Sequence, residues 1–433
     1  MCLRRTFVAP FCRAFCFVVL LCCVTGCDTL PLGGSDAASL RADFSSREMP
    51  PVRSPVEEAT DDNNSFETAQ PATLPDQGQI EIHGRIDFQG DVDLYALGAA
   101  AAGDLVIVDV SGHDGLNTAA ALFDGNGDLI KANNDRSYYA GQYDPYISQV
   151  IRSETGMLFV GIAVSTATHF ATSGGRYSTG SYTIRVTRQM GATYPAARQQ
   201  VVWLDFAGGE RVQIALEPAE VMRPFSAESM SARFTGQTDY IADLVVSHLR
   251  RDLTPFNVFL LDSRYDARPG GPYTKLYFGN FNAAYLGLAD NVDTGNTRLD
   301  QKAIIFTEDI GMFEGLLPSA EAAALAIANI AAHELGHLLG LEHSGEPADV
   351  MATAASARQI LEIDATYLRS RVERSVFPLG WQDGYGQLMQ NVGPNPFGST
   401  ARARMDDFLP AGMTPIDPSL GDLPITMCGR CSP

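Results

Sequence analysis

Hydrophobic and polar residues alternate in short runs through the first half of the chain, from about residue 66 to residue 188. Turn residues separate the runs, and strict alternation places successive side chains on opposite faces of a β-strand. The pattern predicts strands at residues 80–86, 92–97, 105–110, 119–123, 149–152, 157–164 and 182–186. A series of short strands of this kind is typical of an all-β sandwich.

The pattern changes near residue 199, where apolar runs begin to mix with helical spacing. Strands are predicted at residues 201–206, 212–216, 256–261 and 303–306, and helices at residues 239–253 and 358–373. Ser319 is a suitable N-cap for an Ala-rich helix that runs to about Leu339. Strands followed by a long helix indicate an α/β or α+β domain, so the expected fold class is multidomain: a sandwich and then an α/β (α+β) domain.

Composition divides the chain into five parts, and its 433 residues are enough for two folded cores. Residues 1–26 are predicted to be a signal peptide. Residues 27–65 are predicted to be a tether, because Ser, Asp, Glu and Pro dominate there without hydrophobic periodicity. The sandwich is expected at residues 66–190 and the second domain at residues 195–392. Residues 393–433 are irregular and Pro-rich and are predicted to be a tail.

The formal net charge of the chain is −20. A surface of this sign repels phosphate, so nucleic acid is not an expected partner. The acidity fits an exported protein that holds calcium, and it equally fits a plain solvated surface, which we favour.

The N-terminus has the pattern of an export signal. Arg4 and Arg5 precede an apolar run at about residues 14–24 that is too short for a confident membrane span. Residues 24–27, Val-Thr-Gly-Cys, resemble the lipobox of bacterial lipoproteins. The resemblance implies a lipid anchor at Cys27 and a bacterial cell-envelope location, at the periplasmic face or the cell surface, or later release outside the cell. The alternative is an ordinary signal peptide that is rich in cysteine.

Five of the eight cysteines leave with this signal, which keeps only Cys27, Cys428 and Cys431 in the mature chain. Cys428 and Cys431 have the spacing of half a zinc site or of a redox pair, but the sequence has no second half and no surrounding βαβ pattern. A local disulfide between them, formed in an oxidising exterior, is the preferred interpretation.

The strongest chemical signal lies at the end of the Ala-rich helix. His333 and His337 are four residues apart, so they project from one helix face and can bind one metal ion together. Glu334 follows the first histidine and is expected beside the metal as a general base, not as a ligand. Gly340 can adopt a left-handed conformation, end the helix and turn the chain so that His343 supplies a third imidazole. Three histidines leave a tetrahedral zinc ion one open position.

The segment from His333 to His343 matches the pattern HExxHxxGxxH at every specified position and resembles the metzincin family of zinc metallopeptidases. The resemblance implies that Met351 is the methionine of the turn beneath the metal. Ser344 is most similar to the matrix-metallopeptidase branch, and Thr353 stands where the astacin-like branches have a tyrosine ligand. The implied reaction is peptide hydrolysis by zinc-activated water, with the glutamate carrying the proton. Isolated helical histidines are usually structural, but the coincidence of spacing, base, glycine and methionine argues against that interpretation.

Parts of the first domain resemble the bacterial pre-peptidase C-terminal domain. The similarity lies in Gly-Asp-Val-Asp-Leu-Tyr at residues 90–95 and in the closing Gly-Ser-Tyr-Thr-Ile at residues 180–184. Members of that family usually follow a protease, whereas this copy precedes one, so a role does not simply transfer. The turn at residues 124–128 resembles a calcium loop, but Leu129 stands where an EF-hand has glycine, and a hairpin turn is the preferred interpretation.

Two weaker features lie ahead of the histidines. By resemblance, residues 285–289 form the edge strand that pairs with an extended peptide substrate; the alternative is an ordinary strand of the sheet. Asp290, Asp293 and Asn296 belong to an oxygen-rich loop in the region where related enzymes hold structural calcium, although Asp and Asn also populate ordinary turns. We therefore expect one catalytic zinc ion and leave structural calcium open.

The main hypothesis is a zinc endopeptidase that is tethered to the cell envelope and cleaves protein or peptide substrates outside the cytoplasm. One alternative is a surface-binding protein whose sandwich does the binding while the second domain is catalytically silent; the intact Glu334 argues against it. Another alternative is a zinc hydrolase that acts on a non-peptide amide. Substrate preference is not encoded in any motif that we recognise.

Overall fold

The computed structural model describes residues 54–59, 62–88, 90–137, 140–165, 179–214, 217–316, 318–397 and 424–427. All of them lie in one unit, Pro50–Pro433. The predicted signal peptide, the predicted lipidation site Cys27 and the predicted disulfide partners Cys428 and Cys431 lie outside the described residues. Among the helices that are described, none combines the length and the hydrophobicity that a membrane span requires.

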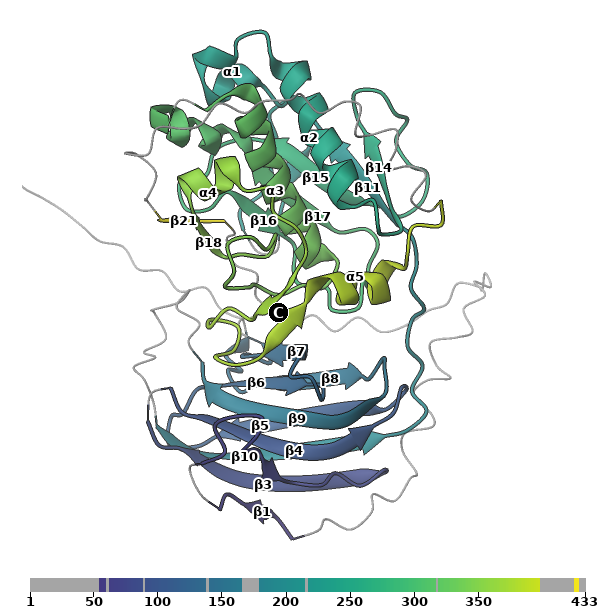
Figure 1. Cartoon of the computed structure of the whole chain (residues 1–433), viewed down its shortest axis with the longest axis vertical. Coiled ribbons are helices and arrows are strands. Elements are labelled where there is room, and N and C mark those ends of the chain that lie inside the picture. Colours follow the sequence, from purple (N-terminus) through teal and green to yellow (C-terminus); the bar gives the residue numbers. More distant parts are fainter. Residues whose placement is uncertain are drawn as a thin grey trace, which may run out of the picture. The chain divides into compact units, whose positions relative to one another are not determined.

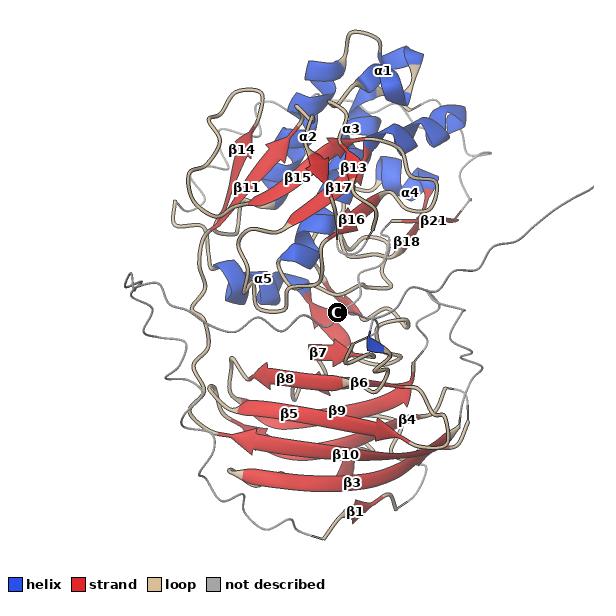
Figure 2. Cartoon of the chain, turned by 180° about the vertical axis from the view of Figure 1, so that it is seen from behind, coloured by secondary structure: helices blue, strands red, loops and turns tan. Residues whose placement is uncertain are grey.

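The first part of the described chain forms two five-stranded sheets (Figures 1 and 2). One sheet has the order β1-β3-β10-β5-β8 and the other the order β2-β4-β9-β6-β7. The strands are β1 (Val56–Glu57), β2 (Gln70–Pro71), β3 (Gly78–Ile86), β4 (Val92–Ala100), β5 (Leu105–Gly112), β6 (Thr118–Phe123), β7 (Leu129–Asn133), β8 (Tyr146–Val150), β9 (Thr155–Val164) and β10 (Gly180–Gln189). Buried and less buried residues alternate along β5 and β10, as the sequence pattern predicts for a sandwich. The predicted all-β sandwich is confirmed.

Residues of the second sheet alternate between two apolar clusters. Tyr95 of β4 belongs to the cluster that residues of both sheets share. Its neighbour Leu94 and Phe123 of β6 belong to another cluster, which also contains Val372 and Phe377 from much later in the chain. Both faces of this sheet are buried, which explains why every residue of β6 is buried.

The free edge of β3 carries a short strand in the stretch predicted as a tether. Val56 lies opposite Ile82 in a parallel pair, so the prediction of a tether over residues 27–65 is wrong at this point. A sheet edge offers unpaired backbone groups, and pairing with them requires no hydrophobic periodicity in the added strand. The turn after β6 is a hairpin, as expected, in which the Asp124 N–H donates to the Asp128 carbonyl oxygen (3.0 Å).

A chain of polar groups is buried inside the sandwich. The hydroxyl groups of Tyr95 and Tyr182 lie 2.8 Å apart, and Tyr182 donates to the Asp93 carboxyl group at 2.6 Å. Asp93 is fully buried, and burial raises its pKa to about 9; the Tyr182 hydrogen bond opposes this shift, while nearby Glu58 and Asp91 add to it. Asp93 is therefore protonated at neutral pH.

The second part is built on a mixed sheet of order β14-β11-β15-β17-β16. Its strands are β11 (Gln200–Asp205), β14 (Val258–Asp262), β15 (Thr274–Gly279), β16 (Gly287–Ala289) and β17 (Lys302–Phe306), and β12 (Arg211–Val212) pairs separately with β13 (Glu220–Val221). Neighbours in the large sheet are parallel except β16, which runs antiparallel to β17 at the edge. The predicted α/β (α+β) class is confirmed.

Two long helices, α2 (Thr238–Asp252) and α3 (Ala320–Leu338), lie side by side on one face of this sheet, as the opposite views of Figures 1 and 2 show. Ser319 caps α3 as predicted, because its hydroxyl accepts a hydrogen bond from the Ala322 N–H (3.2 Å). Almost every residue of α3 is buried, and its many alanines let other elements approach closely. The shorter helices before it are α1 (Ala227–Met230), η3 (Ala232–Phe234) and η4 (Thr307–Leu316).

The helix predicted at residues 358–373 is wrong beyond its first turns. Between α3 and residue 393 the elements are β18 (Ala354–Ser356), α4 (Ala357–Glu362), β19 (Arg369–Arg371), β20 (Trp381–Asp383) and α5 (Gly384–Val392). A capping box between Ser356 and Gln359 starts α4. The helix stops at Ile363, whose backbone is extended and whose carbonyl oxygen accepts from the buried Asn329 amide (2.8 Å). This hydrogen bond from Asn329 of α3 thus holds Ile363 in an extended conformation, although the local spacing of hydrophobic residues favours a longer helix.

The predicted irregular tail, residues 393–433, also contains a strand. Residues Pro424–Thr426 form β21, which pairs antiparallel with β18. A Pro-rich sequence without alternation does not reveal such pairing, because the partner strand lies far earlier in the chain.

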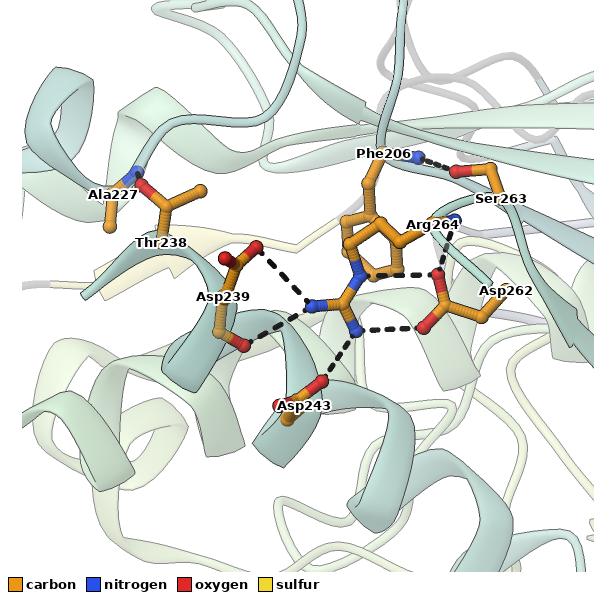
Figure 3. A network of polar contacts seen from close by, with 8 residues as sticks. All are labelled: Phe206, Ala227, Thr238, Asp239, Asp243, Asp262, Ser263 and Arg264. Atoms are coloured by element: carbon orange, nitrogen blue, oxygen red, sulfur yellow. Dashed lines mark hydrogen bonds and ion pairs between the residues drawn. The ribbon is translucent and has the colours of Figure 1, made fainter. Parts of the chain in front are cut away.

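Arg264 fastens α2 to the end of β14 (Figure 3). Its guanidinium donates to both carboxylate oxygens of Asp262 (3.1 and 2.7 Å) and to Asp243 of α2 (2.8 Å). The same group lies over the Phe206 ring, 5.0 Å from its centroid. Asp262 is almost fully buried, and its paired charge makes a carboxylate tolerable there. This network links the sheet to one of the two helices that pack on it.

Candidate metal centre

Three histidine rings meet at the C-terminal end of α3. Nε2 of His337 lies 3.0 Å from Nε2 of His333 and 3.2 Å from Nε2 of His343. All three residues are buried, and among the described residues theirs is the one group of three or more His, Cys, Asp or Glu side chains whose ligand atoms converge closely enough to hold a metal. Bonds of about 2.0–2.1 Å to a tetrahedral zinc ion separate two ligand nitrogens by about 3.3 Å, so these donors fit zinc.

The outer nitrogens of two of the rings fix their tautomers. Nδ1 of His333 donates to the Val350 carbonyl oxygen and Nδ1 of His337 to the Leu341 carbonyl oxygen, both at 2.7 Å. Because a carbonyl oxygen can only accept, each Nδ1 carries the proton and each Nε2 keeps its lone pair toward the centre. Burial lowers the pKa of His333 to about 4; burial and then the neighbouring His343 and His333 lower the pKa of His337. Both rings are thus neutral, the form that binds metal.

The turn from α3 to the third histidine depends on Gly340. Its φ angle is 101°, and a Cβ at this position would lie 2.8 Å from the Asp293 carbonyl oxygen. The Gly340 N–H donates to the His337 carbonyl oxygen and the Leu341 N–H to the Gly336 carbonyl oxygen, each at 2.9 Å. This pair of bonds is the Schellman arrangement that ends a helix, and it matches the expectation from the sequence.

Glu334 is buried on α3 against Gly287 of the edge strand β16. A side chain on Gly287 would place its Cβ 2.7 Å from Cδ of Glu334, so the carboxylate keeps its present position only while residue 287 is a glycine. The sequence motif did not point to Gly287. A glycine inside a short apolar strand, which often marks a close approach, is the signal that could have found it.

Met351 is fully buried against α3, where its sulfur atom fills the space that a side chain on Gly336 would need. The Ser344 N–H donates to the Met351 carbonyl oxygen (2.8 Å), and the Met351 N–H donates to the Asp349 carboxylate (3.1 Å). Asp349 also accepts from the Ser370 hydroxyl, and its burial raises its pKa. The Met351 turn is therefore bonded directly to the residue that follows His343.

The backbone of Glu342 and His343 forms hydrogen bonds with two residues that the motif did not predict. The side-chain amide of Gln382 in β20 accepts from the Glu342 N–H and donates to the Glu342 carbonyl oxygen, both at 2.7 Å. The Glu373 N–H donates to the His343 carbonyl oxygen at 3.0 Å. Such partners orient metal ligands without touching the metal.

The predicted calcium ligands, Asp290, Asp293 and Asn296, lie in the loop after β16. Asp290 accepts from the Lys302 N–H (3.0 Å), and Asp293 accepts from the Thr297 hydroxyl (2.5 Å). Asn296 has a φ angle of 48°, a conformation that Asn adopts readily in turns. These bonds suit an ordinary turn, and structural calcium at this loop stays a prediction.

The segment with the three histidines also has a recognised family match. Residues 280–366 match the family model of the matrixins. The match covers this stretch of the chain, which is similar to the matrixins. The matched residues include His333, His337, His343, Glu334 and Met351. Together, the match and the histidine cluster support a zinc metallopeptidase.

No curated protein matches the chain. Solved structures similar to parts of it include a periplasmic inhibitor of g-type lysozyme from Aeromonas hydrophila, at 17% identity over 28% of this chain and 96% of that chain, with a TM-score of 0.22. The pre-peptidase C-terminal domain of a collagenase from Bacillus anthracis is 16% identical over 29% of this chain and all of that chain (100%), with a TM-score of 0.21. A family two carbohydrate esterase from Cellvibrio japonicus is 12% identical over 43% of this chain and 52% of that chain, with a TM-score of 0.14. The sandwich is assigned from its own strand pairing.

Proposed function

We propose that this chain is a zinc-dependent endopeptidase that cleaves peptide bonds of extracytoplasmic proteins. The observation that carries the proposal is the convergence of three buried Nε2 atoms, 3.0 and 3.2 Å apart, at the end of a helix that also carries Glu334. His333, His337 and His343 would hold the zinc ion. A zinc ion bound there supplies a Lewis acid that polarises a peptide carbonyl and makes water a better nucleophile.

Residues of the chain carry out the proton transfers and bind the substrate. Glu334 takes a proton from the attacking water as general base and returns it to the departing amine nitrogen as general acid. The products are one carboxylic acid and one amine for each peptide bond. The edge strand β16 presents backbone groups to which an extended substrate can add as a further strand. Gly287 keeps this strand close to the Glu334 carboxylate.

The test is cleavage of a broad peptide library, read by mass spectrometry, with the zinc-loaded protein and with Glu334→Ala. We expect cleavage that a chelator abolishes and that Glu334→Ala loses. Glu346→Ala is the matched control, because this exposed glutamate follows the third histidine closely and should leave cleavage unchanged. Equal cleavage by Glu334→Ala would refute the role of Glu334. Cleavage of no peptide would favour a silent binding protein, or, if only non-peptide amides are hydrolysed, an amidase.

We also propose, from the lipobox resemblance alone, that the chain is exported and anchored in the bacterial cell envelope through acyl chains on Cys27. Two acyl signals are generally needed for stable anchoring, and a lipidated N-terminal cysteine provides them. Metabolic labelling with a fatty acid should mark the parent chain and not Cys27→Ala. Label on both chains would contradict this anchor.

A further inference from the structure

The C-terminal strand β21 lies beside the candidate catalytic centre. It pairs antiparallel with β18, with Thr426 opposite Ala354 and Pro424 opposite Ser356. The next residue, Met427, continues the pairing, because its N–H donates to the Thr353 carbonyl oxygen at 3.0 Å. A segment from the end of the chain thus runs along the strand that follows the Met351 turn.

Met427 also bonds to the opposite wall. The Gly287 N–H of the edge strand β16 donates to the Met427 carbonyl oxygen at 3.1 Å. Gly287 is the residue whose α-carbon faces the Glu334 carboxylate. The backbone of Met427 therefore bridges β16 and the segment after Met351, beside the proposed general base.

The side chain of Met427 anchors the segment in the protein interior. It is only 5% exposed and belongs to the apolar cluster that contains Leu335, next to Glu334 in sequence, and Met351. Two backbone bonds and one buried apolar side chain are the contacts by which an extended peptide adds to a sheet edge. The backbone groups of Gly287 and Thr353 thus bind an extended peptide, and in this structure that peptide is the chain's own segment Pro424–Met427.

We infer that residues Pro424–Met427 act as an internal competitor that occupies the substrate path and slows, without abolishing, cleavage by the full chain, which is a partial latency. This inference rests on the proposed function, since latency has meaning only for an active enzyme. Attachment to the same chain gives the segment an effective concentration of the order of millimolar, so modest affinity is enough to exclude free substrate. Release or removal of the segment exposes the Gly287 N–H and the Thr353 carbonyl oxygen to a substrate.

The experiment compares cleavage of a peptide substrate by the full zinc-loaded chain, by a chain that ends at Leu423, and by the full chain with Met427→Asp. The aspartate places a charge in an apolar cluster and should expel the segment. We expect about a tenfold or greater increase in cleavage rate for both altered chains, as for loss of a tethered competitor. Met427→Leu is the matched control, because it keeps an apolar side chain of similar volume and should stay latent. Zinc content and melting temperature show that each chain is folded.

A binding measurement separates this inference from the proposed function. The probe is a fluorescent peptide amide with the sequence of residues 421–427, titrated into the chain that ends at Leu423 and carries Glu334→Gln. Saturable binding that an unlabelled copy competes away is expected. If the probe binds but no chain cleaves any peptide, the binding of Pro424–Met427 between β16 and β18 is supported and the proposed function fails.

Two outcomes would overturn the inference while leaving the proposed function intact. One is equal cleavage by the full and shortened chains together with no binding of the probe. The other concerns the cysteines that follow Met427 in the sequence: a full chain with Cys428→Ser and Cys431→Ser keeps Pro424–Met427 and should remain latent. Full activity of that chain would mean that a thiol, and not strand pairing, holds the enzyme inactive.

Discussion

The backbone N–H of Glu373 donates a hydrogen bond to the carbonyl oxygen of His343, with 3.0 Å between the two atoms. The same segment is bonded again where the Gly345 N–H donates to the Arg371 carbonyl oxygen, also at 3.0 Å. A few residues further on, Phe377 is fully buried in a cluster with strands of the sandwich, and its ring centroid lies 5.5 Å from that of Phe123. His343, the third proposed metal ligand, is thereby connected to the sandwich through one short segment.

Phe377→Ala should therefore weaken zinc binding as well as folding. Removal of a buried phenylalanine side chain costs about 3–5 kcal/mol of unfolding free energy. Loss of its packing loosens the segment that bonds to His343, and loss of such outer partners typically lowers metal affinity about 10- to 100-fold. Chelator competition measures the zinc affinity, and chemical denaturation of the zinc-free protein measures the stability.

Phe66→Ala is the matched control for Phe377→Ala. Phe66 packs against the same cluster, with ring centroids 5.3 Å from Phe123 and 5.2 Å from Phe159, but it does not belong to the segment after β19. We expect it to lower stability and to leave zinc affinity unchanged. Equal zinc affinities for both variants would show that the sandwich does not support the third ligand.

Gly287→Ala should lower the rate of catalysis about 100-fold without removing the metal. The added Cβ would lie 2.7 Å from Cδ of Glu334, so the carboxylate must move away from its position beside β16. Misplacement of a general base by about 1 Å can lower the rate about 100-fold. The three histidines do not contact Gly287 in this way, so zinc content should stay at one ion per chain.

Gly345→Ala provides the comparison for Gly287→Ala. A Cβ at Gly345 meets open space, although this residue lies only two positions after His343. The variant should keep the parent rate of cleavage. A Gly287→Ala chain that also keeps the parent rate would show that Glu334 has room to shift, and that the close approach of β16 is not required.

The pH dependence of stability should report the buried carboxyl group of Asp93. Burial raises its pKa from 3.8 to about 9, so between these values the folded chain holds a proton that the unfolded chain has released. The stabilising contribution of the protonated form is fully present below about pH 4 and is lost as the pH rises toward about 9. Asp93→Asn carries no ionisable group and keeps an acceptor for the Tyr182 hydroxyl, so it removes this dependence.

Chemical denaturation of the parent and of Asp93→Asn at a series of pH values tests the prediction. The unfolding free energy of the variant relative to the parent should rise with pH, by at most about 1.4 kcal/mol for each pH unit. A difference that is constant between about pH 5 and pH 9 would contradict the raised pKa.

The sequence alone determined the division into a sandwich and a mixed α/β domain, and it predicted the three histidines of the candidate metal centre. Both rest on local patterns. Alternation places strand side chains on two faces, and a spacing of four places His333 and His337 on one helix face. Gly340 then turns the chain within three residues to bring in His343. Because these relations span eleven residues, no distant contact was needed to predict them.

Local patterns failed where a distant partner sets the backbone. The helical spacing at residues 358–373 predicted one helix. The helix α4 instead ends at Ile363, where the Asn329 side-chain amide donates a hydrogen bond to the Ile363 carbonyl oxygen. The stretches containing β1 and β21 lack alternation, and each is a strand because it pairs with the edge of another. Such pairing uses backbone groups that every residue has, and no residue type marks it.

Only the tertiary structure decided what surrounds the three histidines. It brings Gly287 against Glu334, connects Glu373 to His343, and lays Met427 between β16 and the strand after Met351. The Glu334 side chain lies where Gly287 has none, and the other contacts are backbone hydrogen bonds between residues that are distant in the sequence. Sequence spacing predicts how the histidines are arranged because an α-helix has a fixed rise and rotation per residue. The other contacts form only once the sheets and helices have packed.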